Sequence, residues 1–219
     1  MKNIKTKTVL WILVTLSIVI FFVLLKFNGV ENIGIKEVFG MISKIITIDS
    51  LVILIFSKYF WKCKIFKNWL VLIPDLSGTW KGYIYSSWED PLTGRKPDRI
   101  PAILTINQSL FNISCVMRTS EMKSHSFVCN FIIDSENQIR RLAYMYDSIP
   151  KQNVKDRSPQ HFGSVVYDLI ENDKKLLGEY WTQRKTTGSI ELEFWTIEKK
   201  DSIPDDLGNH PVSSLRNND

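Results

Sequence analysis

The segment from residue 178 to residue 190 holds the side chains of this sequence that best suit the binding of an anion. Tyr180, Thr182 and Arg184 alternate with other residues, and alternate side chains of an extended strand lie on one face. An arginine presents a planar fork of donors to a phosphate, a threonine hydroxyl can donate to a phosphate oxygen, and a tyrosine ring provides a surface on which a base stacks. Tyr180, Thr182 and Arg184 are therefore the candidate ligand-binding residues.

The same arginine also suits a purely structural role. Gly78 and Gly82 flank Trp80 at the start of a strand-like run, so the large ring can lie against bare backbone at a crowded barrel end. Barrels of the lipocalin type often pack an arginine over such a tryptophan. The residues by themselves favour neither the ligand-binding role of Arg184 nor the structural one.

No residue pattern in the sequence indicates catalysis or a metal centre. His125, His161 and His210 lie far apart along the chain, which lacks the motifs of zinc proteases, serine hydrolases and phosphate-binding loops. A membrane-bound hydrolase would require His125 or His161 beside a carboxylate in a cleft. We therefore predict that the protein is not an enzyme and has no catalytic residue, no metal and no cofactor.

The basic charge of the chain belongs to its N-terminal third. The net charge is +5 at pH 7, but residues 1–74 carry ten Lys and Arg against three Asp and Glu, whereas residues 75–199 carry sixteen of each. A nucleic-acid-binding patch would put the excess on the folded domain, so neither DNA nor RNA is predicted as a partner. Cys63, Cys115 and Cys129 show no metal-binding spacing and suit free thiols, with a Cys115–Cys129 disulfide as the alternative.

The N-terminal region contains two apolar runs that are long enough to cross a membrane. The first, residues 8–27, carries one charge, Lys26, and a helix of about 20 residues spans a hydrocarbon core of about 30 Å. It exceeds the apolar core of a signal peptide, and no small-residue cleavage site follows it. Because a second run covers residues 41–61, residues 1–70 are predicted to form a transmembrane helical hairpin.

Lysines on the flanks of these runs predict the orientation of the hairpin. The loop between the runs is nearly neutral, whereas both outer flanks are basic. Since positive flanks stay on the cytoplasmic side of a membrane, we expect a multi-pass protein with its N- and C-termini in the cytoplasm. The flanking lysines are Lys2, Lys5 and Lys7 before the first run, and Lys58, Lys62, Lys64 and Lys67 after the second.

The residue pattern of 75–199 predicts a cytosolic β-domain. Eight short runs of alternating polar and apolar residues follow one another, and no helical stretch of comparable length interrupts them. This number of consecutive strands favours an all-β, eight-stranded up-and-down (lipocalin-like) barrel, because closure removes exposed edges; a two-sheet sandwich is the alternative. The runs are 78–87, 102–108, 112–118, 124–134, 138–147, 163–171, 174–183 and 189–198.

Three segments lie outside this regular pattern. The connections 88–101 and 148–161 are long, and loops of such length in a small domain are often functional or mobile. The second carries Lys151, Lys155 and Arg157, which could cover a phosphate-bearing ligand or simply be solvated. Residues 200–219 are rich in Ser, Asn, Asp and Pro, a composition that predicts a disordered tail.

These features together resemble the two-transmembrane β-barrel effectors of bacterial CBASS anti-phage systems. The resemblance covers about residues 8–198 and is carried by the two spans before a barrel and by two short motifs. It implies a receptor for a cyclic dinucleotide that a companion CD-NTase synthesises, with Tyr180, Thr182 and Arg184 as ligand contacts. The motifs are Gly78-Thr79-Trp80-x-Gly82 and Tyr180-Trp181-Thr182-x-Arg184-x-Thr186-x-Gly188.

The resemblance also implies how such an effector acts. Ligand binding is expected to cause self-association into homo-oligomers in the bacterial inner membrane and to disrupt the lipid bilayer, which leads to abortive-infection cell death. In this setting Asp49 is either a contact between helices of the assembled form or a tolerated carboxyl near the interface. The alternative function is a membrane-tethered, lipocalin-like binder of an apolar ligand, which inward-facing Ile84, Leu192 and Phe194 without Arg184 would favour.

Overall fold

The computed structural model describes residues 3–28, 34–90 and 94–212, and its chain divides into two units. One unit comprises the residues up to Pro74 together with Ser109–Phe111, and the other comprises the rest of the described chain. The first unit is helical, whereas the second contains every strand of the sheet. The two units are described in turn.

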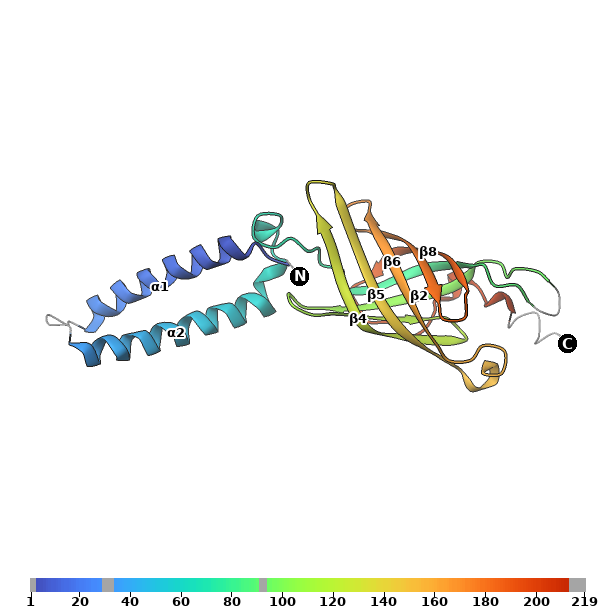
Figure 1. Ribbon diagram of the computed structural model, residues 1–219, viewed down its shortest axis with the longest axis horizontal. Coiled ribbons are helices and arrows are strands. Elements are labelled where there is room, and N and C mark those ends of the chain that lie inside the picture. The colour runs from blue at the N-terminus through green and yellow to red at the C-terminus, as the bar shows by residue number, and fades with distance from the viewer. Residues whose placement is uncertain (1–2, 29–33, 91–93, 213–219) are drawn as a thin grey trace. The chain divides into compact units, whose positions relative to one another are not determined.

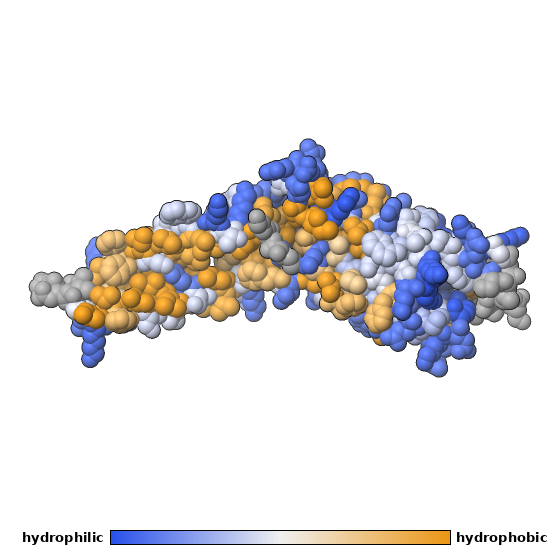
Figure 2. All heavy atoms as spheres, viewed as in Figure 1, coloured by the Kyte–Doolittle hydropathy of each residue, from blue (hydrophilic) through white to orange (hydrophobic). Residues whose placement is uncertain are grey.

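The helical unit is an antiparallel pair, α1 (Thr6–Asn28) and α2 (Ile35–Lys58) (Figure 1). Both helices are long and apolar enough, by length and composition, to cross a membrane, and Figure 2 shows hydrophobic side chains along them. The second helix begins earlier than the apolar run at Met41, because Gly34 caps a helical turn that starts at Ile35. The predicted loop residues 29–33 lie outside the described residues.

One polar contact joins the two helices. Ser17 of α1 donates a hydrogen bond to Asp49 Oδ2 of α2 at 2.6 Å. The other carboxylate oxygen, Asp49 Oδ1, is buried and has no hydrogen-bond partner among the described residues. A polar pair between otherwise apolar helices holds them in register, so within one chain Asp49 already serves as an interhelical contact.

The second unit is a closed antiparallel barrel in which each strand pairs with the next and β8 pairs with β1. This architecture confirms the predicted eight-stranded up-and-down barrel and excludes the two-sheet sandwich. Five of the strands extend beyond a predicted end, β2, β4, β6 and β8 at the start and β5 at the finish. The strands are β1 (Gly78–Ser86), β2 (Ile100–Gln108), β3 (Ile113–Arg118), β4 (Met122–Asp134), β5 (Ile139–Pro150), β6 (His161–Ile170), β7 (Lys175–Thr182) and β8 (Thr187–Thr196).

Trp80 fills one end of the barrel. Its side chain is 1% exposed, its Nε1 donates a hydrogen bond to the Leu76 carbonyl at 3.0 Å, and its ring meets Phe194 edge to face at 5.4 Å between centroids. Phe194 is the neighbour of Trp80 across the β1–β8 ladder, whereas Gly188, at the start of β8, pairs with Ser86 at the other end of β1. Arg184 lies just before Gly188 in the chain, and therefore at the end of the barrel opposite Trp80. It does not pack over Trp80.

Three cross-strand pairs of a tyrosine with a glycine fill much of the rest of the interior. Tyr146 pairs with Gly163, Tyr167 with Gly178 and Tyr180 with Gly188, across three successive ladders from β5 to β8. A Cβ atom on any of these glycines would lie between 2.4 and 2.6 Å from the ring of its tyrosine. Since real Cβ atoms do not approach so closely, each ring depends on the bare backbone of the neighbouring strand.

The chain after β8 runs back along the outer face of β1. Residues 198–212, which include the short helix η4 (Asp205–Leu207), contact the outward side chains of β1 one after another, although composition alone predicts disorder for 200–219. Residues 213–219 lie outside the described residues. The contacts are Thr79 Oγ1 to the Glu198 carbonyl at 2.7 Å, Lys200 N to Thr79 Oγ1 at 2.9 Å, an ion pair of Lys81 with Asp206, and Tyr83 Oη to the Leu207 carbonyl at 3.5 Å.

The tyrosine–glycine pairs lead to a stability prediction. We expect Gly178→Ala to lower the free energy of unfolding by about 1–3 kcal/mol, because the added methyl group forces the buried Tyr167 ring to move. Chemical denaturation of the full-length protein in detergent, followed by tyrosine and tryptophan fluorescence, measures the change. Ser189→Ala, an exposed position on the adjacent strand, is the control and should change stability little; an equal loss in both variants would contradict the role of the pair.

Candidate functional site

A cavity of about 150 Å³ opens at the end of the barrel opposite Trp80. Its walls combine aliphatic side chains such as Ile84 and Ile190 with three tyrosines, Tyr144, Tyr146 and Tyr180. Cavities of this volume in protein interiors accommodate a group of the size of benzene. The charged side chains of the lining, Glu121, Arg157 and Arg184, come from connections between strands.

Tyr180 is held rigidly in the cavity wall. Its hydroxyl donates a hydrogen bond to Ser86 Oγ at 3.0 Å, and its ring lies over Gly188. Burial raises the pKa of Tyr180, and it likewise raises the pKa values of Tyr144 and Tyr146. All three phenols therefore stay neutral at physiological pH and can act as hydrogen-bond donors.

Arg184 reaches the cavity from a turn rather than from a strand. β7 ends at Thr182, so the alternating pattern predicted through Arg184 stops there, and a tight turn with Lys185 at a φ of 62° follows. Thr182 closes this turn, because its Oγ1 accepts a hydrogen bond from the Thr186 amide at 3.2 Å. Tyr180, Thr182 and Arg184 nevertheless all line the same cavity, as does Thr186.

The guanidinium of Arg184 is fastened to the long β5–β6 connection. Its Nη1 donates a hydrogen bond to Ser158 Oγ at 3.1 Å, and Ser158 Oγ in turn contacts Met122 Sδ at 3.6 Å. Partial burial lowers the pKa of Arg184, but an arginine keeps its charge at every physiological pH. The rim thus contains a permanent positive charge beside the cavity.

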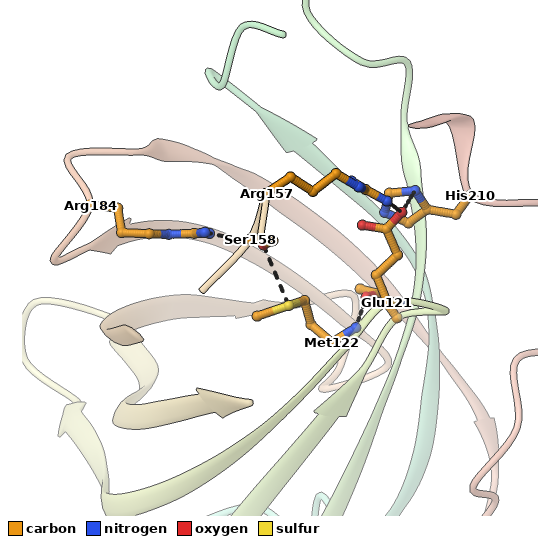
Figure 3. Close-up of polar contacts among 7 residues, drawn as sticks. Glu121, Met122, Arg157, Ser158, Arg184 and His210 are labelled. Carbon is orange, nitrogen blue, oxygen red and sulfur yellow. Dashed lines mark hydrogen bonds and ion pairs between the residues drawn. The ribbon is translucent and has the colours of Figure 1, made fainter. Parts of the chain in front are cut away.

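A second charged group at the rim centres on Glu121 (Figure 3). The Glu121 carboxylate, which is 6% exposed, pairs with Arg157 of the β5–β6 connection, and His210 Nδ1 lies 3.1 Å from Glu121 Oε1. In Figure 3 both Arg157 and His210 point toward this carboxylate, while Arg184 approaches Ser158 from the other side. Burial lowers the pKa of His210, although the neighbouring Glu121 acts in the opposite direction.

His161 contributes a neutral ring to the same cavity. Its Nδ1 lies 3.1 Å from the Pro159 carbonyl, and burial lowers its pKa. Neither His161 nor His125 forms an ion pair with a carboxylate in the part of the chain that the structure describes, as a hydrolase would require. The described part of the chain also contains no group of three or more His, Cys, Asp or Glu side chains that could hold a metal ion.

Several rim residues were missed by reasoning from the sequence. Glu121 and His210 gave no signal, because their importance comes from lying next to each other across distant parts of the chain. The sequence indicates that the connection 148–161 is basic, yet of Lys151, Lys155 and Arg157 only Arg157 lines the cavity. The alternation of Tyr144 and Tyr146 on β5, which pairs with the strand that contains Gly163, was a local pattern that could have indicated an aromatic wall.

The comparisons with known proteins agree with one another. A family model described as "Cap15, cyclic dinucleotide receptor domain" matches residues 71–193, which comprise more than half of the chain. A relative from Staphylococcus schleiferi named CD-NTase-associated protein 15 is 28% identical over 180 residues, 80% of this chain and 90% of the relative. A protein of the same name from Escherichia albertii is 26% identical over 186 residues, 81% of this chain and 89% of the relative.

The lowered pKa of His161 leads to a prediction about pH. Below about pH 6.5 an unfolded histidine binds a proton, whereas the buried ring resists protonation, so the unfolded state holds more protons and stability falls as the pH drops below 6.5. We expect His161→Gln to weaken this fall between about pH 6.5 and 5. Thermal unfolding of the full-length protein in detergent across this range measures it. Exposed His125→Gln is the control, and equal slopes for His161→Gln and wild type would contradict the prediction.

Proposed function

This chain belongs to the Cap15 family of cyclic dinucleotide receptors associated with CBASS, and on that premise we propose that its barrel binds a cyclic dinucleotide at the open end. The observation that carries the proposal is a cavity with tyrosine walls and an arginine at its rim. Tyrosine rings stack on nucleobases, and arginine binds phosphate. The two halves of the site thus suit the two chemical parts of a nucleotide.

Tyr180, Thr182 and Arg184 are the proposed ligand contacts. A cavity of about 150 Å³ has room for a single ring system, so one base enters the barrel beside Tyr180 and the phosphates stay at the rim. Among the described residues, the Arg184 guanidinium donates to a neutral hydroxyl, that of Ser158, and forms no ion pair with a carboxylate, so it can bind a phosphate at the rim. Thr182 Oγ1 accepts one hydrogen bond in the turn, and its hydroxyl can still donate one to the ligand.

Removing the charge of Arg184 tests this site. We expect Arg184→Ala to weaken cyclic dinucleotide binding by roughly 10- to 100-fold, since a hydrogen bond to a charged group contributes about 1.5–3 kcal/mol. Calorimetric titration of the full-length protein in detergent with cyclic di-AMP, cyclic di-GMP and cyclic GMP–AMP measures the affinity. Lys185→Gln, at the exposed neighbouring position, is the control for a loss of charge.

Two results would overturn the assignment of Arg184. Unchanged affinity in Arg184→Ala would exclude Arg184 as a ligand contact. A ligand-free Arg184→Ala protein that no longer unfolds cooperatively would give Arg184 a structural role instead. Wild-type protein that binds none of the three nucleotides would count against the proposed function as a whole.

A membrane-tethered binder of an apolar ligand is the alternative, and the rim charges disfavour it. Ile84 does line the cavity, but Leu192 and Phe194 do not, and Arg184 and Arg157 do. Arg157 keeps its ion pair with Glu121, but an apolar ligand without an anionic group would leave the Arg184 guanidinium next to it without an anion. Stabilisation by fatty acids and by no nucleotide in the same titration would reverse this choice.

The helical unit is the proposed effector part. We propose that α1 and α2 cross the bacterial inner membrane with both chain ends in the cytoplasm, that the ligand-bound form self-associates, and that this assembly disrupts the bilayer and kills the infected cell. The lengths and apolar surfaces of both helices support the membrane assignment, and the lysine flanks support the orientation. Asp49 Oδ1, which has no hydrogen-bond partner within the described residues, is a candidate contact between subunits in the assembled form.

Dye-filled liposomes test the effector part. We expect wild-type protein reconstituted in them to release dye only when a cyclic dinucleotide that it binds is added, because the ligand must favour the assembled form over the single chain. Arg184→Ala should release little dye at the same nucleotide concentration. Equal release with and without nucleotide, or no release by ligand-saturated protein, would contradict the coupling.

A further inference from the structure

The segment 198–212 ends at the mouth of the cavity. After its contacts along β1, the segment turns over the rim, where His210 and Val212 are both buried and both line the cavity. The family model ends at residue 193, so this segment lies outside the matched receptor domain. It is therefore a feature of this chain that the family assignment by itself does not account for.

The Glu121 carboxylate lies between Arg157, with which it forms an ion pair, and the His210 ring, whose Nδ1 is close to it without the geometry of a hydrogen bond. Glu121 accepts from the Arg157 guanidinium and lies 3.1 Å from His210 Nδ1. Its backbone is also fixed, because the Lys151 amide donates to the Glu121 carbonyl at 2.8 Å and the Thr119 hydroxyl accepts from the Glu121 amide at 3.3 Å. A carboxylate rigidly placed between an arginine and a histidine occupies the kind of position that a phosphate oxygen would fill.

Arg157 and Arg184 are both next to Ser158, Arg157 along the chain and Arg184 through a hydrogen bond. Ser158 follows Arg157 in the chain and accepts the hydrogen bond of Arg184 at 3.1 Å. A cyclic dinucleotide carries two phosphates, each with one negative charge. Arg184 can bind one of these phosphates, and Arg157 can bind the other once its ion pair with Glu121 has broken.

We propose that Arg157 is a second phosphate-binding residue, that Glu121 masks it in the ligand-free protein, and that segment 208–212 is a lid latched over the cavity through His210. This inference rests on the proposed nucleotide site and adds its regulation. Binding of the second phosphate draws Arg157 away from Glu121 and brings a negative charge next to this carboxylate, which moves the Glu121 side chain away from the phosphate and from His210. The lid then leaves the mouth, and the surface around the rim differs between the ligand-free and ligand-bound forms.

The rest of the segment is anchored independently of the latch. Asp206 pairs with Lys81, and the Leu207 carbonyl accepts from Tyr83 on the outer face of β1. Gly208 follows with a φ of 78°, a backbone conformation that glycine adopts without strain. Residues after Gly208 can therefore move while the part before it stays bound to the barrel.

Hydrogen exchange tests the latch without any ligand. The full-length protein in detergent is compared with His210→Ala and with Glu121→Gln, and amide exchange is measured for peptides that cover residues 205–212. We expect both variants to exchange faster than wild type after residue 208, because each loses one partner of the latch. Asp206→Asn is the matched control, since it removes an ion pair of the same segment away from the cavity and should change exchange around 205–207.

Nucleotide titration tests the masked arginine. With whichever of cyclic di-AMP, cyclic di-GMP and cyclic GMP–AMP wild type binds, His210→Ala and Glu121→Gln should bind at least about fivefold more tightly, because the closed state no longer competes. Arg157→Ala should bind about tenfold or more weakly, because it removes a charged contact to phosphate. The opposite effects of His210→Ala and Arg157→Ala are the signature that a merely structural cluster would not produce.

The outcomes separate this inference from the proposed function. If no wild-type nucleotide binding occurs, the proposed function and the masked arginine fail together, while exchange still decides whether the latch exists. If wild type binds but His210→Ala exchanges after residue 208 at the wild-type rate, the latch is overturned. If Arg157→Ala binds as tightly as His210→Ala, Arg157 is not a phosphate contact.

Discussion

The interior of the barrel depends on the pairing of tyrosines with glycines across neighbouring strands. An eight-stranded barrel leaves an interior that side chains must fill, and this one places Tyr146, Tyr167 and Tyr180 over glycines. Each glycine lets a ring lie flat against backbone, which fixes the ring and leaves space beside it. Two of these rings, Tyr146 and Tyr180, form part of the cavity wall, whereas Tyr167 is fully buried and the buried Trp80 fills the other end.

Barrel topology explains why charged residues from distant parts of the chain meet at one rim. In an up-and-down barrel, alternate connections share an end, so the β1–β2, β3–β4, β5–β6 and β7–β8 connections lie together at the open mouth. They supply Trp88, Glu121, Arg157 and Arg184, respectively, to the cavity. The strand walls stay apolar and aromatic, so the barrel separates a base-sized pocket from a charged rim.

The placement of charge in the two units fits a sensor that acts on a membrane. The helical unit holds the excess positive charge of the chain, whereas the barrel is nearly balanced, with acidic and basic side chains paired across its outer face, as in Arg141–Asp168. A ligand influences assembly only through a difference in its affinity for two states. In the proposed latch, residues 208–212 are the part of the barrel unit that differs between the ligand-free and ligand-bound forms.

Tyr180, Thr182 and Arg184 line one cavity, although Arg184 reaches it from a turn and not from the strand that the alternation predicts. The sequence alone was sufficient for the two apolar helices, the eight strands and the closed barrel. These features follow from local patterns, namely helix length, the period of two in strands and turn residues. It was not sufficient for the Glu121, Arg157 and His210 cluster, for the course of residues 200–212 along β1, or for the position of Arg184 relative to Trp80. Those depend on the register and closure of the barrel, because contacts between residues that are distant in sequence have no local signature; only the tertiary structure brings such residues together.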